Sequence, residues 1–235
     1  MRKKRVFDDF DHFSTEYRQI HNQNLKISGV DSDYFCEHKV IEVKRFEADS
    51  ARKKILDLGC GDGMTEMYFQ KHFPLSKKFG IDVSKESIKQ AIRKNIPDCT
   101  FNSYDGNKIL YKDNTFDVIF IACVLHHIDR RYHQKIINEC YRTLKPGGNL
   151  YIFEHNMYNP LTKMLVNNCA FDHEAVLLPA RYLIRIIKQA GFIRANIRYV
   201  LFFPRLKFFQ PFIACERWLS KIPVGGQYYI KSSKL

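Results

Sequence analysis

A glycine-rich turn joins a short apolar run to a helical pattern near residue 60 of this chain. The apolar run, 55–58, is typical of a buried strand, and the turn 59–63 reads Gly-Cys-Gly-Asp-Gly. Glycine lets the backbone turn tightly and approach a ligand closely. A strand, such a turn and a helix, in this order, predict a nucleotide-binding unit of a parallel α/β sheet.

An acidic residue stands where such a unit would hold a ribose. Asp82 ends the next predicted strand, 21 positions after Gly61, and an acid there can accept hydrogen bonds from both ribose hydroxyls. Asp62 lies inside the loop and Asp57 lies before it. These carboxylates would repel a pyrophosphate but can receive an α-ammonium group. The loop therefore favours a nucleoside with a cationic substituent over a dinucleotide.

Strand and helix patterns alternate along most of the chain. Helical periodicity predicts helices over 9–24, 32–49, 62–72, 84–94, 130–144 and 179–190. Short apolar runs predict strands over 55–58, 79–83, 99–103, 116–121, 149–153, 193–201 and 226–231. The Pro-Gly-Gly segment at 146–148 is expected to stop the helix before it. Such alternation is typical of a parallel sheet covered on both faces, with ligands beyond the carboxyl ends of its strands.

The second predicted helix, over 32–49, has one apolar side. Phe35, Val40, Val43 and Phe46 recur at helical spacing, so we expect all four to face the core.

Cysteine usage and the N-terminus bear on the compartment. The 7 cysteines form no C-x-x-C pair, so we expect reduced thiols and no zinc knuckle. The basic start has no apolar stretch behind it, as a secretory signal would require, and no run of about 18 apolar residues predicts a membrane span. We expect a cytoplasmic protein without a metal.

Five segments, in order, resemble motifs of the class I S-adenosylmethionine-dependent methyltransferases. They are 55–63, 80–84, 103–106, 114–128 and 144–148. The resemblance implies an α/β, three-layer αβα Rossmann-like methyltransferase fold, with a seven-stranded, mostly parallel sheet and a reversed last strand. It implies S-adenosyl-L-methionine as cofactor and S-adenosyl-L-homocysteine as product. The matching positions imply as cofactor-binding residues Asp57, Gly59, Cys60, Gly61, Asp82, Val83, Tyr104, Asp105, Gly106, Ala122 and Cys123.

Further segments suggest a subgroup and a division of the chain. Residues 153–162 and 222–229 resemble bacterial small-molecule methyltransferases associated with glycan genes. We expect an N-terminal helical lid at 1–50, a cofactor-binding core at 51–200 and a basic aromatic C-terminal extension, 201–235, that completes the sheet.

Polar residues that follow two predicted strands are candidates for the chemistry. Adjacent residues such as His126 and His127 should point apart, and no third ligand stands at metal spacing, so we expect no metal pair. Either one histidine packs beneath the cofactor, or His126, His127, His155 or Glu154 acts as a general base for an acceptor hydroxyl or amine. Alignment of the reactants alone contributes about 7–11 kcal/mol, so methyl transfer does not require a strong base.

The polar run after the strand at 149–153 has two interpretations. Burying it would be costly without hydrogen bonds, so we expect Asn156, Tyr158 and Asn159, with Tyr17 of the first helix, to contact the acceptor. The alternative is that the Asn and Tyr side chains cap the next helix.

The net charge of +13 is concentrated at the two ends of the chain. Residues 1–5 carry +4 and residues 193–235 carry +7, which leaves +2 for the remainder. The last segment is also rich in aromatic residues. It could cover the sheet with snorkelling basic side chains, rest on an anionic membrane, or bind nucleic acid.

The expected function is methyl transfer from S-adenosylmethionine to O or N of a small-molecule, sugar or lipid-linked acceptor. A basic chain suits an anionic acceptor. Two alternatives stay open: an rRNA or tRNA methyltransferase, and a non-catalytic S-adenosylmethionine-binding protein. Nucleic acid is the less favoured partner because no RNA-binding module is visible.

Overall fold

A computed structural model describes residues 32–47, 52–169, 175–203, 207–213 and 215–235 of the chain. The helix predicted over 9–24, with Tyr17, lies outside these residues. No helix in the described ranges has both the length and the apolar character needed to cross a membrane.

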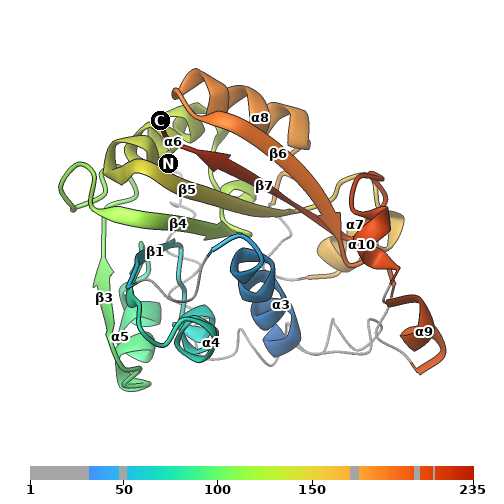
Figure 1. The fold of residues 1–235 in the computed structure, drawn as a ribbon, viewed down its shortest axis with the longest axis horizontal. Coiled ribbons are helices and arrows are strands. Elements are labelled where there is room, and N and C mark those ends of the chain that lie inside the picture. The colour runs from blue at the N-terminus through green and yellow to red at the C-terminus, as the bar shows by residue number, and fades with distance from the viewer. Residues whose placement is uncertain (1–31, 48–51, 170–174, 204–206, 214) are drawn as a thin grey trace, which may run out of the picture.

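Seven strands form one sheet, in the order β3-β2-β1-β4-β5-β7-β6 (Figure 1). Their bounds are β1 Lys54–Leu58, β2 Lys77–Asp82, β3 Cys99–Ser103, β4 Phe116–Ala122, β5 Leu144–His155, β6 Ile193–Val200 and β7 Gln227–Ser233. The first five strands pair in parallel, whereas β7 runs antiparallel to both β5 and β6. The mostly parallel sheet with a reversed last strand is therefore confirmed.

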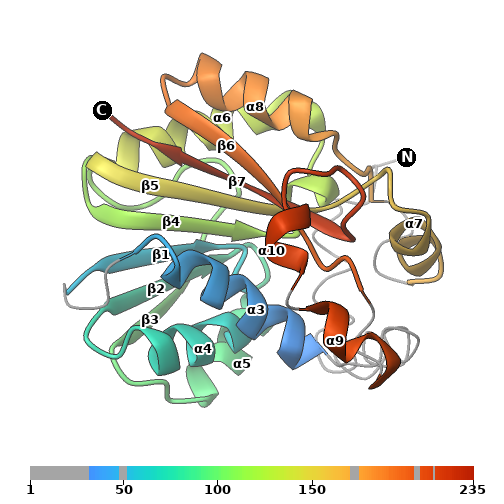
Figure 2. The ribbon, with the colours of Figure 1, turned by 45° about the vertical axis from the view of Figure 1, so that its right-hand side comes forward.

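Helices cover both faces of the sheet, which gives three layers (Figures 1 and 2). One face carries α3 Ser32–Lys44, α4 Met64–His72 and α5 Lys85–Arg93, and the other carries α6 Arg130–Thr143 and α8 Ala180–Gln189. The shorter elements are η2 Leu125–His127, α7 Pro160–Asn167, η3 Lys207–Phe209, α9 Gln210–Ile213 and α10 Glu216–Leu219. Figure 2 shows α7, α9 and α10 at the end of the sheet toward which β4 points.

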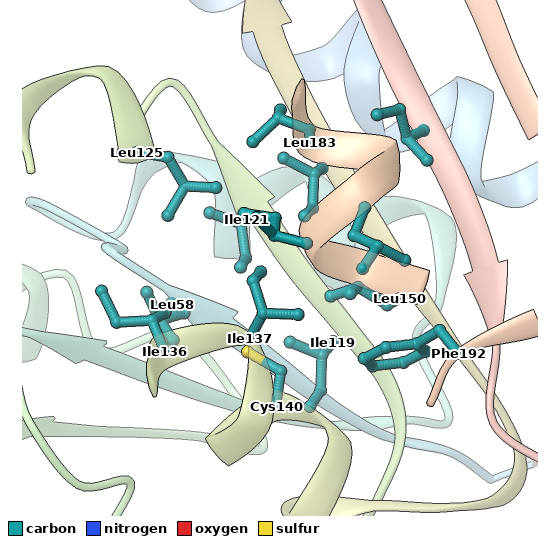
Figure 3. Packing of buried hydrophobic residues seen from close by; sticks show 14 of the residues in the cluster. Leu58, Ile119, Ile121, Leu125, Ile136, Ile137, Cys140, Leu150, Leu183 and Phe192 are labelled. Carbon is teal, nitrogen blue, oxygen red and sulfur yellow. The ribbon is translucent and has the colours of Figure 1, made fainter. Parts of the chain in front are cut away.

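The larger core cluster lies between the sheet and the α6–α8 layer (Figure 3). Ile119 and Ile121 of β4 and Leu150 of β5 pack with Ile137 of α6 and Leu183 of α8, and all five are buried. Burying such a side chain stabilises the fold by about 1.5–3 kcal/mol, so this cluster holds β4 and β5 firmly in place. The ends of these two strands carry the candidate catalytic residues.

A second cluster fastens α3 to the opposite face. Val40 and Val43 pack with Phe69 of α4 and with Phe120 and Phe153 of the sheet. The expectation for these two valines is thus confirmed.

The C-terminal end predicted for the helix over 32–49 is wrong. The helix ends at Lys44, so Phe46 lies in the following turn, is 46% exposed, and sits beneath the Lys231 ammonium at 5.4 Å. Phe35 is only half-buried. Phe46 stands at helical spacing from Val43 although it lies outside the helix. Apolar spacing alone therefore does not show where a helix ends.

Strand β5 is longer than the predicted 149–153. It begins at Leu144, directly after α6, and its pairing with β4 is interrupted between Leu144 and Asn149. The Pro-Gly-Gly segment therefore forms an irregularity inside the strand. Gly147 adopts a φ of +78°, and its N–H donates to the carbonyl of Lys234 at 2.9 Å.

Candidate active site

Loops at the carboxyl ends of β1, β2, β4 and β5 bring the sequence-predicted residues together. The loop after β1 is tied to β2: the N–H groups of Gly59 and Cys60 both donate to the carbonyl of Ile81, at 2.7 and 3.2 Å. The next N–H, that of Gly61, donates to Asp82 Oδ2 at 2.9 Å. The glycine loop is thereby fixed against the end of β2.

The carboxylate of Asp82 is oriented from two sides. Besides Gly61, the N–H of Ser84 donates to its Oδ1 at 2.8 Å. Each carboxylate oxygen has a second lone pair, so Asp82 can still accept hydrogen bonds from a bound ligand. Val83 follows it and is half-buried.

Two positions of the loop favour glycine for different structural reasons. Gly59 has a φ of +83°, and a Cβ there would lie 2.3 Å from Val124 Cγ2. Gly61 has a φ of +55°, and a Cβ there would meet nothing within 4 Å. The backbone of Gly61 therefore borders open space, which is what close approach of a ligand requires.

Two buried carboxyl groups lie beneath the loop. Burial, with the negative charge of Asp82 as a second cause, raises the pKa of Asp57 to about 8, against an opposing effect of Lys39. Glu66 of α4 is completely buried, and neither carboxyl oxygen has a hydrogen-bond partner within the described ranges. Burial and the neighbouring Asp57 raise the pKa of Glu66 well above its usual value. This pair therefore retains a proton at pH values where carboxyl groups are normally ionised.

The loop after β3 lies next to a cavity of about 230 Å³. The cavity is lined by Ile81, Asn102, Ser103, Tyr104, Leu110 and Tyr111. Tyr104 is joined to β2 through its N–H, which donates to the carbonyl of Asp82 at 3.0 Å. Asp105 accepts N–H groups of Asn107 and Lys108 at 2.8 and 3.1 Å, and these bonds lower the pKa of its carboxyl. Gly106 has a φ of +75°.

The residues after β4 meet the helix α3. Ala122 ends β4, and Cys123 has a φ of +58° with its N–H donating to the carbonyl of Phe153 at 2.9 Å. The buried Lys39 and the ring of His155 both form hydrogen bonds with the Cys123 thiol. Burial would raise the pKa of this thiol, but Lys39 and His155 lower it to about 7. Cys123 is therefore substantially ionised at neutral pH.

Glu154 and His126 form a buried pair. One oxygen of Glu154 accepts the N–H of Leu125 at 3.0 Å, and the other lies 2.5 Å from His126 Nδ1. Burial acts to raise the pKa of Glu154, but His126 and the two neighbouring histidines lower it below its usual value. The pair joins the end of β5 to η2.

The adjacent histidines do not point apart, so that expectation is wrong. They lie in η2, which turns tightly, and the ring centroids of His126 and His127 are 4.2 Å apart. The ring of His155 lies 5.2 Å from that of His126. Across the described ranges no group of three His, Cys, Asp or Glu side chains is arranged to hold a metal ion.

The polar residues after β5 make hydrogen bonds to the segment before β7 and to the start of α7. Asn156 donates to the carbonyls of Pro223 and Gly225 at 3.1 and 2.7 Å. Asn159 caps α7, since its side chain accepts the N–H of Thr162 at 2.9 Å, as the capping alternative describes. Tyr158 is exposed. A contact of these residues with an acceptor stays a prediction.

Three residues of this region were missed as site residues by sequence reasoning. Lys39 reaches Cys123 only through the packing of α3, and Glu66 lies on the buried side of α4. Gln227 is buried opposite His155 in the β5–β7 pairing, and its side-chain oxygen has no partner within the described ranges. The signal available was a polar residue on the apolar side of a helix, at Glu66 and at Lys39, which lies between Phe35 and Val43 at helical spacing.

Comparison with known proteins identifies relatives of part of the chain. Residues 55–148 match a family model described as a methyltransferase domain. Phosphoethanolamine N-methyltransferase 3 of Arabidopsis thaliana is 35% identical over 106 residues, which are 44% of this chain and 21% of that protein. The chain spans about a fifth of the length of that relative and well under half of two other curated relatives.

Solved structures resemble the whole fold. A SAM-dependent methyltransferase from Thermotoga maritima, described as a possible histamine N-methyltransferase, has a TM-score of 0.70 at 17% identity and covers 98% of this chain and 100% of its own. Phosphoethanolamine N-methyltransferase 2 of Haemonchus contortus, in complex with S-adenosyl-L-methionine, has a TM-score of 0.66 at 18% identity, covering 99% and 60% respectively. At these identities the likeness shows a shared fold.

Proposed function

We propose that this protein transfers a methyl group from S-adenosylmethionine to O or N of a small-molecule, sugar or lipid-linked acceptor, since residues 55–148 match a family model described as a methyltransferase domain. The observation that carries the proposal is the bond between Gly61 and Asp82 at 2.9 Å. It places an oriented carboxylate beside a loop whose open side can receive a nucleoside.

The residues around the loop fit this cofactor. Asp82 would accept the ribose hydroxyls, and the open side of Gly61 leaves room for the rest of the molecule. Asp57 and Glu66 are carboxyl groups with raised pKa values beneath the loop. A nearby cationic group of a ligand would favour their ionised form. Bound S-adenosylmethionine supplies an electrophilic methyl group on its sulfonium sulfur.

The polar residues at the ends of β4 and β5 would hold the acceptor and receive its proton. His126 is tied to Glu154 in the interior, so it is the weaker candidate for a base. His127 is only half-buried, and His155 contacts the Cys123 thiol. We therefore assign the general base, where the acceptor needs one, to His127 or His155.

The relatives support nitrogen or oxygen of a small molecule as the methylated atom. Their names include phosphoethanolamine N-methyltransferase and O-methyltransferase. The net charge of +13 would favour an anionic acceptor, since a basic surface concentrates anions near it.

A transfer assay tests the proposal. The full chain is incubated with radiolabelled S-adenosylmethionine and fractionated cell extract, and the labelled product is identified by mass spectrometry. We expect label in a small-molecule or lipid fraction, and none with Asp82→Ala. Label in RNA would instead support an RNA methyltransferase. Tight cofactor binding without label in any fraction would support a non-catalytic binding protein.

A further inference from the structure

Five large apolar side chains between β6 and β7 point into solvent. They are Phe208, Phe212, Trp218, Ile222 and Val224, and we call them the apolar rim. Trp218 and Phe208 are the most exposed, at 79% and 78%. Scattered exposed apolar residues are common, but a group of them within one segment marks a contact surface.

The apolar rim borders the candidate active site. Its last part is bound to the loop after β5, because Asn159 donates to the carbonyl of Val224 at 2.7 Å and Asn156 donates to that of Pro223. On that loop and on α7, Tyr158 and Met164 are exposed as well. Figure 2 shows α7, α9 and α10 together at the end of the sheet toward which β4 points, where the site lies.

The charged residues around the apolar rim are basic. Arg217 and Lys221 flank Trp218 in sequence and are exposed, and Lys163 is exposed beside Met164 on α7. Glu216 is the one acidic residue in 201–235. It is buried, and its carboxylate accepts the N–H of Phe203 at 3.2 Å. The rim therefore presents cations and apolar side chains without an exposed carboxylate in its own segment.

We propose that the apolar rim rests on the surface of an anionic lipid bilayer. Exposed Trp and Phe side chains suit the headgroup level of a bilayer, and neighbouring Lys and Arg side chains attract anionic lipids. The side chains of the rim come from several short elements. Each of them can insert into the headgroup region of a bilayer without the others. If the proposed function also holds, the site faces acceptors held in that bilayer, but the binding to lipid does not depend on it.

The chain carries its own probe for this contact, because Trp218 is its only tryptophan. The full chain is mixed with vesicles of phosphatidylcholine alone, or of phosphatidylcholine with phosphatidylserine. With the anionic vesicles we expect a blue shift of the emission and quenching by brominated acyl chains. We expect neither with neutral vesicles. Emission that stays unchanged with both kinds of vesicle would overturn the proposal.

Vesicle flotation with matched variants separates the rim from general charge. Arg217→Glu with Lys221→Glu removes the rim's cations, and Lys85→Glu with Arg93→Glu makes the same change of charge on exposed residues of α5. We expect the first pair to lower vesicle affinity at least about tenfold and the second pair to change it far less. Equal losses would overturn the proposal.

Two other occupants of the rim are outcomes of the same experiments. A blue shift that grows with protein concentration without lipid, with a dimer in sedimentation, would show that a second copy covers the rim. A shift caused by RNA and not by vesicles would assign the rim to nucleic acid. Circular dichroism of every variant confirms that its fold is intact, and cofactor binding by calorimetry reports on the separate proposal about function.

Discussion

The carboxylate of Asp82 accepts a hydrogen bond from the backbone N–H of Gly61 at 2.9 Å. One contact thus ties the glycine loop after β1 to the end of β2 and aims a carboxylate at the space beside the loop. Gly61 follows β1 and Asp82 ends β2, and these strands pair in parallel, which brings their carboxyl ends to the same edge of the sheet.

Asp82→Ala should weaken S-adenosylmethionine binding by about 10- to 100-fold, because a hydrogen bond to a charged group contributes about 1.5–3 kcal/mol. Isothermal titration calorimetry measures the change, and thermal unfolding checks that the variant is folded. The control is Asp117→Ala, which removes a partly exposed carboxylate bound to Lys145 at the start of β4, the end of that strand opposite the site. Unchanged affinity in a folded Asp82→Ala variant would contradict the assignment of the cofactor site.

Gly59→Ala should destabilise the protein more than Gly147→Ala. Both positions have a left-handed φ, +83° and +78°, which costs an alanine about 1–2 kcal/mol. The new methyl group meets Val124 at 2.3 Å in the first case and nothing within 4 Å in the second, so crowding adds about 1–3 kcal/mol at Gly59 alone. Urea unfolding compares the two variants, and equal losses would show that the loop relaxes freely.

Asp57 should make the unliganded protein less stable as pH rises from about 4 to about 8. Asp57 has an ordinary pKa of 3.8 and a folded-state pKa of about 8. In this range the folded state therefore binds more protons than the unfolded state, and stability decreases with pH. Asp57→Asn should flatten the dependence, as measured by urea unfolding at several pH values. Glu66→Gln should weaken it, because it removes a neighbouring carboxyl group. A slope that is unchanged in both variants would exclude this pair as its source.

Cys123 should react with iodoacetamide near pH 7 faster than Cys36 or Cys99. Its pKa is lowered to about 7, whereas burial raises those of the other two thiols to about 11 and about 12, and the thiolate is the reactive form. Mass spectrometry after timed labelling gives the rate at each cysteine. Lys39→Met should slow the reaction by removing the neighbouring cation.

Lys94→Met is the control for this experiment, because Lys94 pairs with Asp62. If both lysine variants react alike, the contact between Lys39 and Cys123 does not set the reactivity of the thiol.

Individual strands and helices could be predicted because their information is local, whereas the seven-stranded sheet with its reversed last strand was implied only by the family resemblance. The run at 116–121 is apolar except for Asp117, and the glycine loop has a fixed order, so strand, turn and helix followed directly from neighbouring residues. The bond between Gly61 and Asp82 places this acid beside the loop, and its role toward a ribose stays a prediction. Capping of the next helix by Asn159 was also foreseen, but only as the alternative to a contact with the acceptor.

Contacts between distant segments could not be predicted. Lys39 meets Cys123 because Val40 and Val43 fix α3 against the sheet, and no pattern within 32–49 states which residue it will face. The ring contact between His126 and His127 depends on the tight turn of η2, which periodicity does not reveal. Phe46 was predicted to face the core as part of the helix, but the helix ends before it, at Lys44.

Strand β6 is hydrogen-bonded to β7 and lies at the edge of the sheet. Along the chain β6 precedes the strand that joins it to β5, so residues 193–200 cannot enter the sheet until residues 227–233 are available. Until then one side of β5 and both sides of β6 offer unpaired backbone groups, which are the surfaces that drive aggregation. The sheet is therefore complete only when β7 pairs with β5 on one side and with β6 on the other.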